Sequence, residues 1–585
     1  MLSSFVAAGP AYELVGLLAP AGVDARVAGR VLEVLGPAAP RLLRDDPWQL
    51  LSISGVAPGD ADRVARAAIP GVRRDDPRRA CALVGFVLAR QAREGHTVTP
   101  NDVVLDRMGE FDTGDPLAAV AAAVESGRVI EIEDGHLLGL ARYAQAELAV
   151  AEGIARLLAT AEPFRADIST AADTLDDAQQ SAVKAALHRG VSVLTGGPGT
   201  GKSRTVATLV ELAESAGKSV ALAAPTGRAA KRLEELCHAP ASTLHRLLGA
   251  QARQSGGNVS FDGGFQRGAD WPLDEHVVVV DEASMLDVEL AEALLCACAD
   301  GTHLVFVGDA AQLPSIGPGR VLGDLIDSGT VPVTSLSTLY RQAEGGTIAR
   351  LAAGIREGGL PVIEDPSREV VVVAARGSAE AAHRVVQLVT DSIPRVLGVP
   401  ADQVQVVTPV HRGGAGTQAL NAALKAALNP GSGSRRFDEG DRVVATANHL
   451  EAEPFGYANG EVGVIDEVER DGAVVVQFAS GPAEVRGKAL ADLTHGWAIT
   501  VHRAQGSEFP AVVVVLPPEA GGMLSRPLVY TAFTRAQKHL SIVHAAGPGL
   551  ARAVRQIGTL PRRTRLMQLL IENASLQVPD PGRER

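Results

Sequence analysis

The chain carries the stretch Gly196-Gly197-Pro198-Gly199-Thr200-Gly201-Lys202-Ser203 after a short apolar run and before a segment of helical periodicity. It matches the pattern G-x-x-x-x-G-K-[ST] in the strand–loop–helix setting that a phosphate-binding loop requires. Glycines let backbone N–H groups wrap around phosphate oxygens, the lysine offsets their charge, and the last hydroxyl can bind Mg²⁺. The nucleotide-binding residues predicted here are Gly197, Pro198, Gly199, Thr200, Gly201, Lys202, Ser203 and the adjacent Arg204.

A second element of the predicted nucleotide site is the apolar run Val277–Val280, which ends in Asp281 and Glu282. A strand here would deliver Asp281 to a Mg²⁺ ion that Ser203 also binds, and Glu282 would polarise the attacking water. Two acids at the end of an apolar run are weak evidence alone, because many strands end in solvated carboxylates. Together with the phosphate loop they predict hydrolysis of ATP with Mg²⁺.

Short β runs alternate with helical segments from about residue 169 onward, which is typical of parallel α/β sheets. The fold class we expect is α/β, with regions at about 169–330 and 331–548. A β-rich insertion at about 437–490 interrupts the second region. The expected strands are Ser192–Thr195, Ser219–Ala224, Val277–Val280, His303–Val307, Val370–Ala374, Val404–Thr408, Ala511–Leu516 and Ser541–His544.

The residues before 169 are rich in Ala, Leu, Val and Arg and are expected to be mainly helical. Within residues 1–77, segments starting at Leu18 and Leu51 each place a Gly-containing turn between helical runs. Such turns can bind DNA phosphates, although ordinary helical hairpins would show the same pattern. Residues 78–168 add helices and a hairpin around Asp134-Gly135, which suggests a winged-helix-like module. Residues 549–585 predict a helix and a disordered tail.

The composition is that of a folded protein without membrane contact, with 46% hydrophobic and 21% charged residues. No apolar run approaches the roughly 20 residues that span a bilayer, and the N-terminus lacks the basic stretch of a secretion signal. Four cysteines without C-x-x-C spacing argue against a zinc site or a disulfide framework. We therefore expect a cytoplasmic protein. The net charge of −13 still allows a local basic groove for nucleic acid.

Five further strings narrow the kind of hydrolase. They are Asp281-Glu-Ala-Ser-Met285, Gly308-Asp-Ala-Ala-Gln312-Leu-Pro-Ser-Ile-Gly-Pro-Gly319, Tyr340-Arg341-Gln342, Thr500-Val-His-Arg-Ala-Gln505-Gly-Ser-Glu508-Phe509 and Tyr530-Thr-Ala-Phe-Thr-Arg535-Ala536. In this order and spacing they resemble the motifs of superfamily 1 DNA helicases, and among these the RecD-like group. The resemblance covers about residues 170–548, and the N-terminal hairpins are similar to those of the RecD-like branch with helix-hairpin-helix domains.

The resemblance implies two RecA-like motor domains with ATP between them and a small SH3-like β-barrel as the insertion. Gln179 would read the adenine, with Gln180 as the rival candidate, and Glu508 lies in a string that contacts either nucleotide or DNA. Arginines from the second domain would stabilise charge on the γ-phosphate, and Gln312 would sense that phosphate. The catalytic set implied is Lys202, Glu282, Gln312, Arg341 and Arg535.

The resemblance also implies that both motor domains grip single-stranded DNA through hydroxyls, helix N-termini and basic side chains. The matching residues are Pro225, Thr226, Arg228, Thr243, His245 and Arg246 in the first domain and Thr408, Arg412, His502 and Arg503 in the second. His245 and Arg246 could equally be ordinary helix residues. Such helicases usually carry Lys where Arg503 stands, which leaves the geometry of that contact open.

The stretch Asn258–Arg267 predicts a strand, a turn at Asp262-Gly263-Gly264 and a second strand, within about 250–272. In the resembling helicases a hairpin here acts as a pin that separates the duplex, and a plain surface loop is the alternative. Aromatic residues make up only 3% of the chain, so we expect DNA to be held more through its backbone than by stacked bases.

Taken together, these features predict an ATP-dependent DNA helicase that moves 5′ to 3′ on single-stranded DNA. We expect it to act as a monomer at single-strand/duplex junctions in replication, recombination or repair. One alternative is the motor subunit of an exodeoxyribonuclease V-type complex, and another is a nucleotide-gated DNA-binding scaffold that does not unwind.

Overall fold

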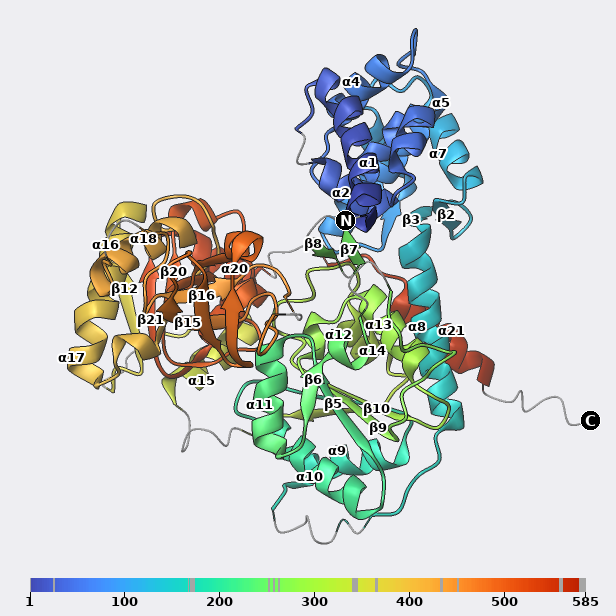
Figure 1. Ribbon diagram of the computed structural model, residues 1–585. Coiled ribbons are helices and arrows are strands. Elements are labelled where there is room, and N and C mark those ends of the chain that lie inside the picture. The colour runs from blue at the N-terminus through green and yellow to red at the C-terminus, as the bar shows by residue number, and fades with distance from the viewer. Residues whose placement is uncertain are drawn as a thin grey trace, which may run out of the picture.

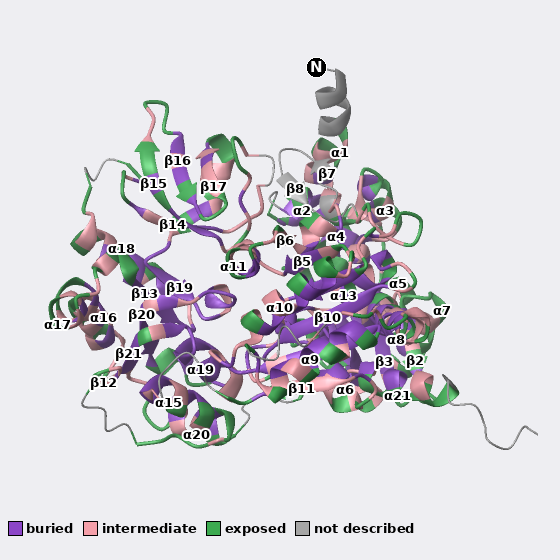
Figure 2. Cartoon of the chain, turned by 90° about the horizontal axis from the view of Figure 1, so that it is seen from below, coloured by how far each residue is buried: buried purple, intermediate pink, exposed green. Residues whose placement is uncertain are grey.

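The chain folds into a helical N-terminal region, two α/β domains and a small antiparallel sheet inserted into the second of them (Figure 1). The computed structural model describes residues 2–577 except 25–26, 167, 169–173, 251–252, 256–257, 261–263, 339–345, 363–366, 432–434, 450–451 and 557–560. Figure 2 shows buried strands through the middle of each α/β domain, with exposed residues concentrated on the outer helices and loops.

The first α/β domain has a six-stranded sheet in which each strand is parallel to its neighbours and the central strands are buried. The sheet order is β11-β4-β10-β9-β5-β6, so β4 lies between two strands that come much later in the chain. Its strands are β4 (Val191–Gly196), β5 (Val220–Ala224), β6 (Ala241–Thr243), β9 (Val277–Val280), β10 (His303–Gly308) and β11 (Val333–Leu336). Its helices are α9 (Asp177–His188), α10 (Lys202–Ser215), α11 (Gly227–Cys237), α12 (Leu244–Leu247), α13 (Val288–Ala297) and α14 (Val321–Ser328).

The second α/β domain has a five-stranded parallel sheet of order β12-β21-β20-β13-β19. Its strands are β12 (Val370–Ala374), β13 (Val404–Thr408), β19 (Ala498–Thr500), β20 (Phe509–Leu516) and β21 (Ala536–His544). Its helices are α15 (Thr347–Arg356), α16 (Ser378–Gln387), α17 (Ile393–Leu397), α18 (Thr417–Leu428), α19 (Arg526–Phe533) and α20 (Gly549–Arg555). All eight strands expected from the sequence are present in the two sheets, whereas β6, β11 and β19 were not expected.

The insertion is a five-stranded antiparallel sheet of order β17-β16-β15-β14-β18, with a hydrophobic core of its own around Tyr457, Val476 and Phe478. Its strands are β14 (Arg442–Ala445), β15 (Val462–Val468), β16 (Val474–Phe478), β17 (Gly481–Val485) and β18 (Leu493–His495). The expected β-rich insertion is therefore present.

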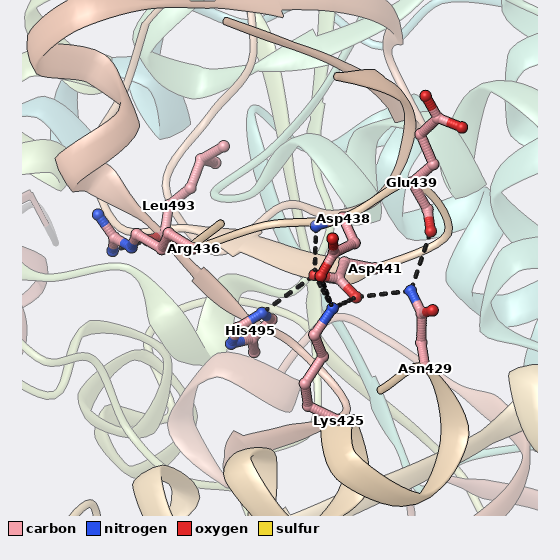
Figure 3. Close-up of polar contacts among 8 residues, drawn as sticks. All are labelled: Lys425, Asn429, Arg436, Asp438, Glu439, Asp441, Leu493 and His495. Atoms are coloured by element: carbon pink, nitrogen blue, oxygen red, sulfur yellow. Dashed lines mark hydrogen bonds and ion pairs between the residues drawn. The ribbon is translucent and has the colours of Figure 1, made fainter. Parts of the chain in front are cut away.

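A buried ion-pair cluster attaches this insertion to α18 (Figure 3). The ammonium of Lys425 lies 2.6 Å from Asp438 Oδ2 and 2.6 Å from Asp441 Oδ1. Asn429 Nδ2 also donates to Asp441 Oδ1, at 2.8 Å, and His495 Nε2 lies 3.3 Å from Asp441 Oδ2. Burial lowers the pKa of His495, although Asp441 opposes this shift. Because Asp438 and Asp441 precede β14 and His495 ends β18, both ends of the insertion meet one helix.

The N-terminal region contains both expected helical hairpins. Gly22, at φ +68°, joins α1 (Leu2–Leu18) to α2 (Val27–Leu35), and Gly55, at φ +84°, leads into α4 (Pro58–Ala68). These positive φ values favour glycine. The remaining elements are α3 (Ala39–Asp45), α5 (Pro77–Arg93), α6 (Asn101–Met108), α7 (Pro116–Glu125) and the sheet β1 (Val98–Pro100), β2 (Val129–Ile132) and β3 (Leu137–Leu140). One hydrophobic core runs from Leu14 to Leu138, so it crosses the division that we expected at residue 77.

The C-terminal segment returns to the first α/β domain. Helix α20 packs on the second α/β domain, but α21 (Leu566–Gln577) lies beside α8 (Ala141–Thr160) (Figure 1). Leu566, Leu569 and Leu570 are buried in the same core as Ile154 and Leu295. The end of the chain therefore belongs physically to the first α/β domain, which the sequence did not indicate. The tail that we expected to be disordered lies mostly outside the described residues. Among the described helices, none is long and apolar enough to cross a bilayer.

Candidate functional site

The phosphate loop joins the carboxyl end of β4 to the N-terminus of α10. Gly199 and Gly201 adopt φ of +77° and +87°, which only glycine reaches readily. Lys202 begins α10, and its ammonium donates to the carbonyl oxygens of Gly196 (2.7 Å) and Gly197 (3.0 Å). A cation, backbone amides and the positive end of a helix therefore converge at one point, an arrangement that binds phosphate.

Asp281 and Glu282 follow β9, two strands away from β4 in the same sheet, so they lie at the same edge as the phosphate loop. Burial raises the pKa of both carboxyls, and Asp281 raises that of Glu282 further, while Lys202 opposes both shifts. Glu282 adopts φ +52°, a left-handed conformation that is strained for a residue with a side chain. The Asp281 carboxylate accepts the Glu282 N–H at 2.8 Å, which stabilises this turn.

Arg535 reaches from the second α/β domain to the first. Its Nη2 donates to Gln312 Oε1 at 3.1 Å, and its other donors bond the carbonyl oxygens of Thr531 and Ser507. Both Arg535 and Gln312 are buried. The structure therefore brings together two of the residues predicted to act on the γ-phosphate.

Further hydrogen bonds close this corner of the cleft. Leu313 N donates to Thr531 Oγ1 at 2.8 Å, and Gln505 Nε2 donates to Leu313 O at 2.9 Å. The hydroxyl of Tyr530 donates to Asp309 Oδ2 at 2.8 Å, and burial together with Asp309 raises the pKa of that hydroxyl. Tyr530 and Thr531 stood in a motif quoted above without an assigned role, and they prove to be cross-domain contacts.

A cavity lies between the phosphate loop and the second α/β domain. The loop residues Gly197–Thr200 form one wall and α15 forms an apolar wall opposite. Arg356, at the end of α15, also lines this cavity and is exposed. The sequence gave no reason to select Arg356, because no motif surrounds it. The lining of the second domain is Ile348, Ala349, Ala352, Ala353, Arg356, Tyr530, Thr534, Ala536 and Gln537.

Gln179 is buried in the first turn of α9. Its Oε1 accepts the N–H of Asp176 at 3.1 Å, whereas its Nε2 has no hydrogen-bond partner among the described residues. Gln180 differs, because its Nε2 donates to Leu175 O at 2.9 Å. Both N–H donors of the Gln179 amide are thus unused by the described residues, which makes it the better of the two for reading the edge of a base.

Two predicted nucleotide contacts, Arg341 and Glu508, are not placed at the phosphate loop by the structure. Arg341 lies outside the described residues, so the structure does not place it. Glu508 is nearly buried, and its Oε1 pairs with Arg232 of α11 at 2.9 Å across the domain boundary. Gln537 Nε2 also donates to Glu508, at 3.3 Å.

The candidate DNA-binding residues cluster at the carboxyl ends of neighbouring strands. In the first domain Ala224, just before Pro225 and Thr226, pairs in register with Thr243. In the second domain Thr408 pairs with Thr500, just before His502 and Arg503. Carboxyl ends of parallel strands form the usual binding edge of α/β sheets. The sequence-derived set therefore forms two matched groups, one on each domain.

Individual members of these groups differ in accessibility. Thr226 and Thr243 cap helices α11 and α12 through hydrogen bonds to Ala229 N and Arg246 N, whereas Arg246 is itself exposed. Thr408 and Arg228 instead bond other groups of the protein. Thr408 is fully buried and donates to Ala415 O, and Arg228 donates to Ser507 Oγ at 3.2 Å.

His502 and Arg503 of the second group lie near His411. Arg412 is exposed, and His502 and Arg503 are half-buried. Burial lowers the pKa of His502, and the neighbouring His411 and Arg562 lower it further. Burial, with a contribution from Arg503, lowers the pKa of His411. This group is therefore locally basic, as contact with a phosphate backbone requires.

The predicted strand beginning at Asn258 is β8 (Asn258–Ser260), but it pairs antiparallel with the upstream strand β7 (Arg253–Ser255). The pairing of β8 with a second strand after the turn predicted at Asp262-Gly263-Gly264 was therefore wrong, and Asp262 and Gly263 of that turn lie outside the described residues. An isolated bridge between Ala250 and Phe265 closes the base of this segment.

Comparison with known protein families gives three matches. The helix-hairpin-helix domain of the ATP-dependent RecD2 DNA helicase matches residues 9–98. The AAA domain matches residues 174–384, and the UvrD-like helicase C-terminal domain matches residues 495–543.

Individual relatives agree with these matches. The chain is 34% identical to the ATP-dependent RecD2 DNA helicase of Deinococcus radiodurans, over 95% of this chain and 78% of that protein. It is also 34% identical to the RecBCD enzyme subunit RecD of Mycobacterium tuberculosis, over 74% and 80% respectively. Among solved structures, Bacteroides Pif1 bound to single-stranded DNA gives a TM-score of 0.40 at 17% identity, over 63% of this chain and 92% of that chain.

Proposed function

The chain belongs to the ATP-dependent RecD2 DNA helicase family, and we propose that it moves 5′ to 3′ along single-stranded DNA. As a member of this family it is an ATP-hydrolysing superfamily 1 DNA helicase. The proposed direction follows from its resemblance to RecD-like helicases. The proposed partner is a single-strand/duplex junction, bound by a monomer at the nucleoid during replication, recombination or repair.

The observation that carries the proposed mechanism is the contact between Arg535 and Gln312. Lys202 would neutralise the β- and γ-phosphates, and Glu282 would accept a proton from the attacking water. Arg535, and Arg341 by resemblance, would stabilise the charge that spreads over the γ-phosphate. Because Arg535 and Gln312 belong to different domains, loss of that phosphate would change how firmly the domains are held together.

Mg²⁺ fits the residues at this site. Burial disfavours the ionised form of Asp281, and a divalent cation would offset that cost. Asp281 and Ser203 would supply two oxygen ligands, with phosphate oxygens and water completing the shell. Within the described part of the chain, no group of three His, Cys, Asp or Glu side chains could hold a metal ion. Bound Mg²⁺ would polarise the phosphate oxygens.

The strand would lie across the two matched groups at the carboxyl ends of the sheets. We propose that Pro225, Thr226, Thr243, Arg246, Arg412, His502 and Arg503 contact its backbone. The insertion, which we propose to be SH3-like, stands next to α11, because Gly227 lies close to Ala458 and Glu461. It would therefore border the same strand. We also assign the hairpin of β7 and β8 a role in separating the duplex, and the N-terminal helical hairpins a role in holding DNA.

The test uses a DNA fork with one labelled strand and either a 5′ or a 3′ single-stranded tail. We expect strand separation by the intact chain only from the 5′ tail, and none with Lys202→Ala. The Lys218→Ala variant, altered outside the phosphate loop, serves as the matched control. Equal unwinding from 3′ tails would contradict the direction. ATP hydrolysis without unwinding of either fork would favour the motor-subunit or the nucleotide-gated scaffold alternative.

A further inference from the structure

The loop Ser315–Gly319, which ends the motif that contains Gln312, has glycines that the nucleotide site does not explain. A Cβ on Gly317 would overlap the Asp287 carboxylate, and one on Gly319, at φ +98°, would lie 3.0 Å from Val288 Cβ. These glycines let the loop lie directly against the start of α13. A third glycine, Gly95 of the N-terminal region, accepts the Gly319 N–H at 3.0 Å.

One side chain from the C-terminal segment holds this loop. Arg562 Nη1 donates to Ser315 Oγ (2.9 Å) and to the carbonyl oxygens of Gly317 (2.9 Å) and Gly319 (2.6 Å). Its Nη2 donates to Ser315 O at 2.5 Å. A Cβ on Gly95 would overlap Arg562 Nε, so glycine there leaves room for the guanidinium. Four hydrogen bonds to one five-residue loop fix the path of its backbone.

The guanidinium is held mainly by neutral acceptors. Burial lowers the pKa of Arg562 to about 10, and Asp287 partly opposes that shift. Lysine could not replace this contact, because its donors radiate from one nitrogen, whereas the arginine fork spreads its N–H groups in a plane. The site therefore selects arginine by geometry as well as charge.

The loop held by Arg562 is continuous with the cross-domain contact. Only Pro314 separates Ser315 from Leu313, which bonds Thr531 and Gln505, and Gln312 precedes Leu313. On its other side the C-terminal segment is tied to the N-terminal region. Arg563 N donates to His96 Nδ1 at 2.9 Å, and Arg563 O accepts the Thr97 N–H at 3.0 Å.

We propose that Arg562 is a positioning residue for ATP hydrolysis: it fixes the loop Ser315–Gly319, which follows Gln312, and so keeps Gln312 against Arg535. This inference rests on the proposed role of Gln312 and Arg535 at the γ-phosphate. Arg562 would act through the backbone and would not touch the nucleotide itself. Its removal should therefore impair turnover more than nucleotide binding.

The experiment measures DNA-stimulated ATP hydrolysis by the full-length chain and the variants Arg562→Ala, Arg562→Lys and Arg563→Ala. We expect Arg562→Ala to lower kcat about tenfold, with KM for ATP changed less than about twofold, because misplacement of a catalytic group mainly reduces turnover. Arg562→Lys should lie between Arg562→Ala and the unsubstituted chain. Arg563→Ala should match the unsubstituted chain, because among the described contacts only its backbone atoms bond the N-terminal region.

An unchanged kcat in Arg562→Ala, or an equal loss in Arg563→Ala, would overturn the inference. A raised KM with unchanged kcat would also overturn it. Thermal melting identifies variants that fail to fold. If Arg562→Ala fails to fold, Arg562→Lys replaces it in the test. An unchanged kcat in Arg562→Lys would then overturn the inference.

A double-substitution cycle provides an independent reading. Gly95→Ala crowds the guanidinium and should lower kcat. Because Gly95 also has a φ of +95°, a smaller loss from backbone strain should remain in an Arg562→Ala background, so the combined loss should be less than additive. Fully additive losses would contradict the inference. Failure of the Arg562 inference can be distinguished from failure of the proposed catalytic role of Arg535, because Arg535→Ala tests that role directly in an otherwise intact chain.

Discussion

Arg535 Nη2 donates to Gln312 Oε1 at 3.1 Å, although 223 residues separate the two in the chain. The contact joins the second α/β domain to the first at the edge of the phosphate-loop cavity. Neither residue reaches solvent appreciably, so the bond forms in a low-dielectric setting where it is strong. The two domains are thus connected through the side chains proposed to meet the γ-phosphate.

Replacing Arg535 by lysine should therefore lower kcat for ATP hydrolysis by about 10²-fold or more, because a lysine keeps the charge but loses the planar fork. Steady-state ATPase assays with saturating single-stranded DNA measure this. Arg526→Lys is the matched control, because Arg526 begins α19 and bonds Val554 O and Arg555 O. Similar kcat values in both variants would argue against a catalytic role for Arg535.

Glu282→Gln should abolish turnover while leaving nucleotide binding intact. The amide cannot accept a proton from water, and loss of a general base costs about 10²- to 10⁴-fold in rate. Binding of a fluorescent ATP analogue, measured beside ATPase activity, separates the two effects. Glu289→Gln, a substitution on α13 with a 48% exposed side chain, should leave both unchanged. Substantial hydrolysis by Glu282→Gln would move the base role elsewhere.

Gln179→Ala should weaken discrimination between ATP and GTP. The unused Nε2 of this buried amide is the donor available to an adenine ring nitrogen, and losing such a contact costs about tenfold or more in kcat/KM. The measurement is kcat/KM for both nucleotides. Gln180→Ala is the control, and a larger loss of discrimination there would reverse the assignment.

The sequence identified the nucleotide site well because its residues follow strands directly. Lys202, Asp281 and Gln312 come after β4, β9 and β10, and parallel neighbours bring their carboxyl ends together. Strands β6, β11 and β19 escaped prediction because they span only three or four residues and carry mixed polar patterns. Such strands owe their formation to neighbours that are distant in sequence.

The environments of individual side chains were harder to predict. Arg228 was selected for DNA, yet its guanidinium lies over the Phe509 ring and bonds Ser507, which only the paired domains reveal. The Ala/Leu-rich helix near the C-terminus was expected, but periodicity cannot tell which core a helix joins. For the same reason Arg562 carried no signal, since its partners lie some 245 residues earlier.

The contribution of Glu147 to stability should fall as the pH rises from about 5 to 7. This carboxyl is buried and accepts hydrogen bonds from Thr97 Oγ1 and Arg565 N. Burial raises its pKa to about 7, so the folded chain holds a proton that the unfolded chain releases near pH 4.5. Glu147 therefore contributes its full stabilisation of the folded state below about pH 4.5, and this contribution is lost as the pH passes about 7.

A neutral amide removes that dependence. Glu147→Gln should be more stable than the unsubstituted chain at pH 8 by up to about 3 kcal/mol, and the difference should shrink toward pH 5. Denaturation curves at several pH values measure it. Glu152→Gln, on the exposed side of α8, is the control. A difference that does not vary with pH would show that Glu147 does not titrate in this range.

Asp441→Asn should detach the insertion from α18. It leaves the buried Lys425 ammonium with a weaker set of acceptors, and breaking one partner of a buried ion pair costs about 3 kcal/mol or more. Hydrogen exchange should rise in β14 and β18, and unwinding should fall more than ATPase activity. Asp466→Asn, exposed on β15, should change neither. Unchanged exchange in β14 would show that the cluster does not anchor the insertion.

The return of α21 to the first α/β domain has a mechanical consequence. The second α/β domain is connected to the rest of the molecule by two covalent crossings, one between β11 and α15 and one between α20 and α21. Two such connections limit how the second α/β domain can move relative to the first, because the chain is attached at both ends of that domain. Cutting the chain after α20 would leave one attachment.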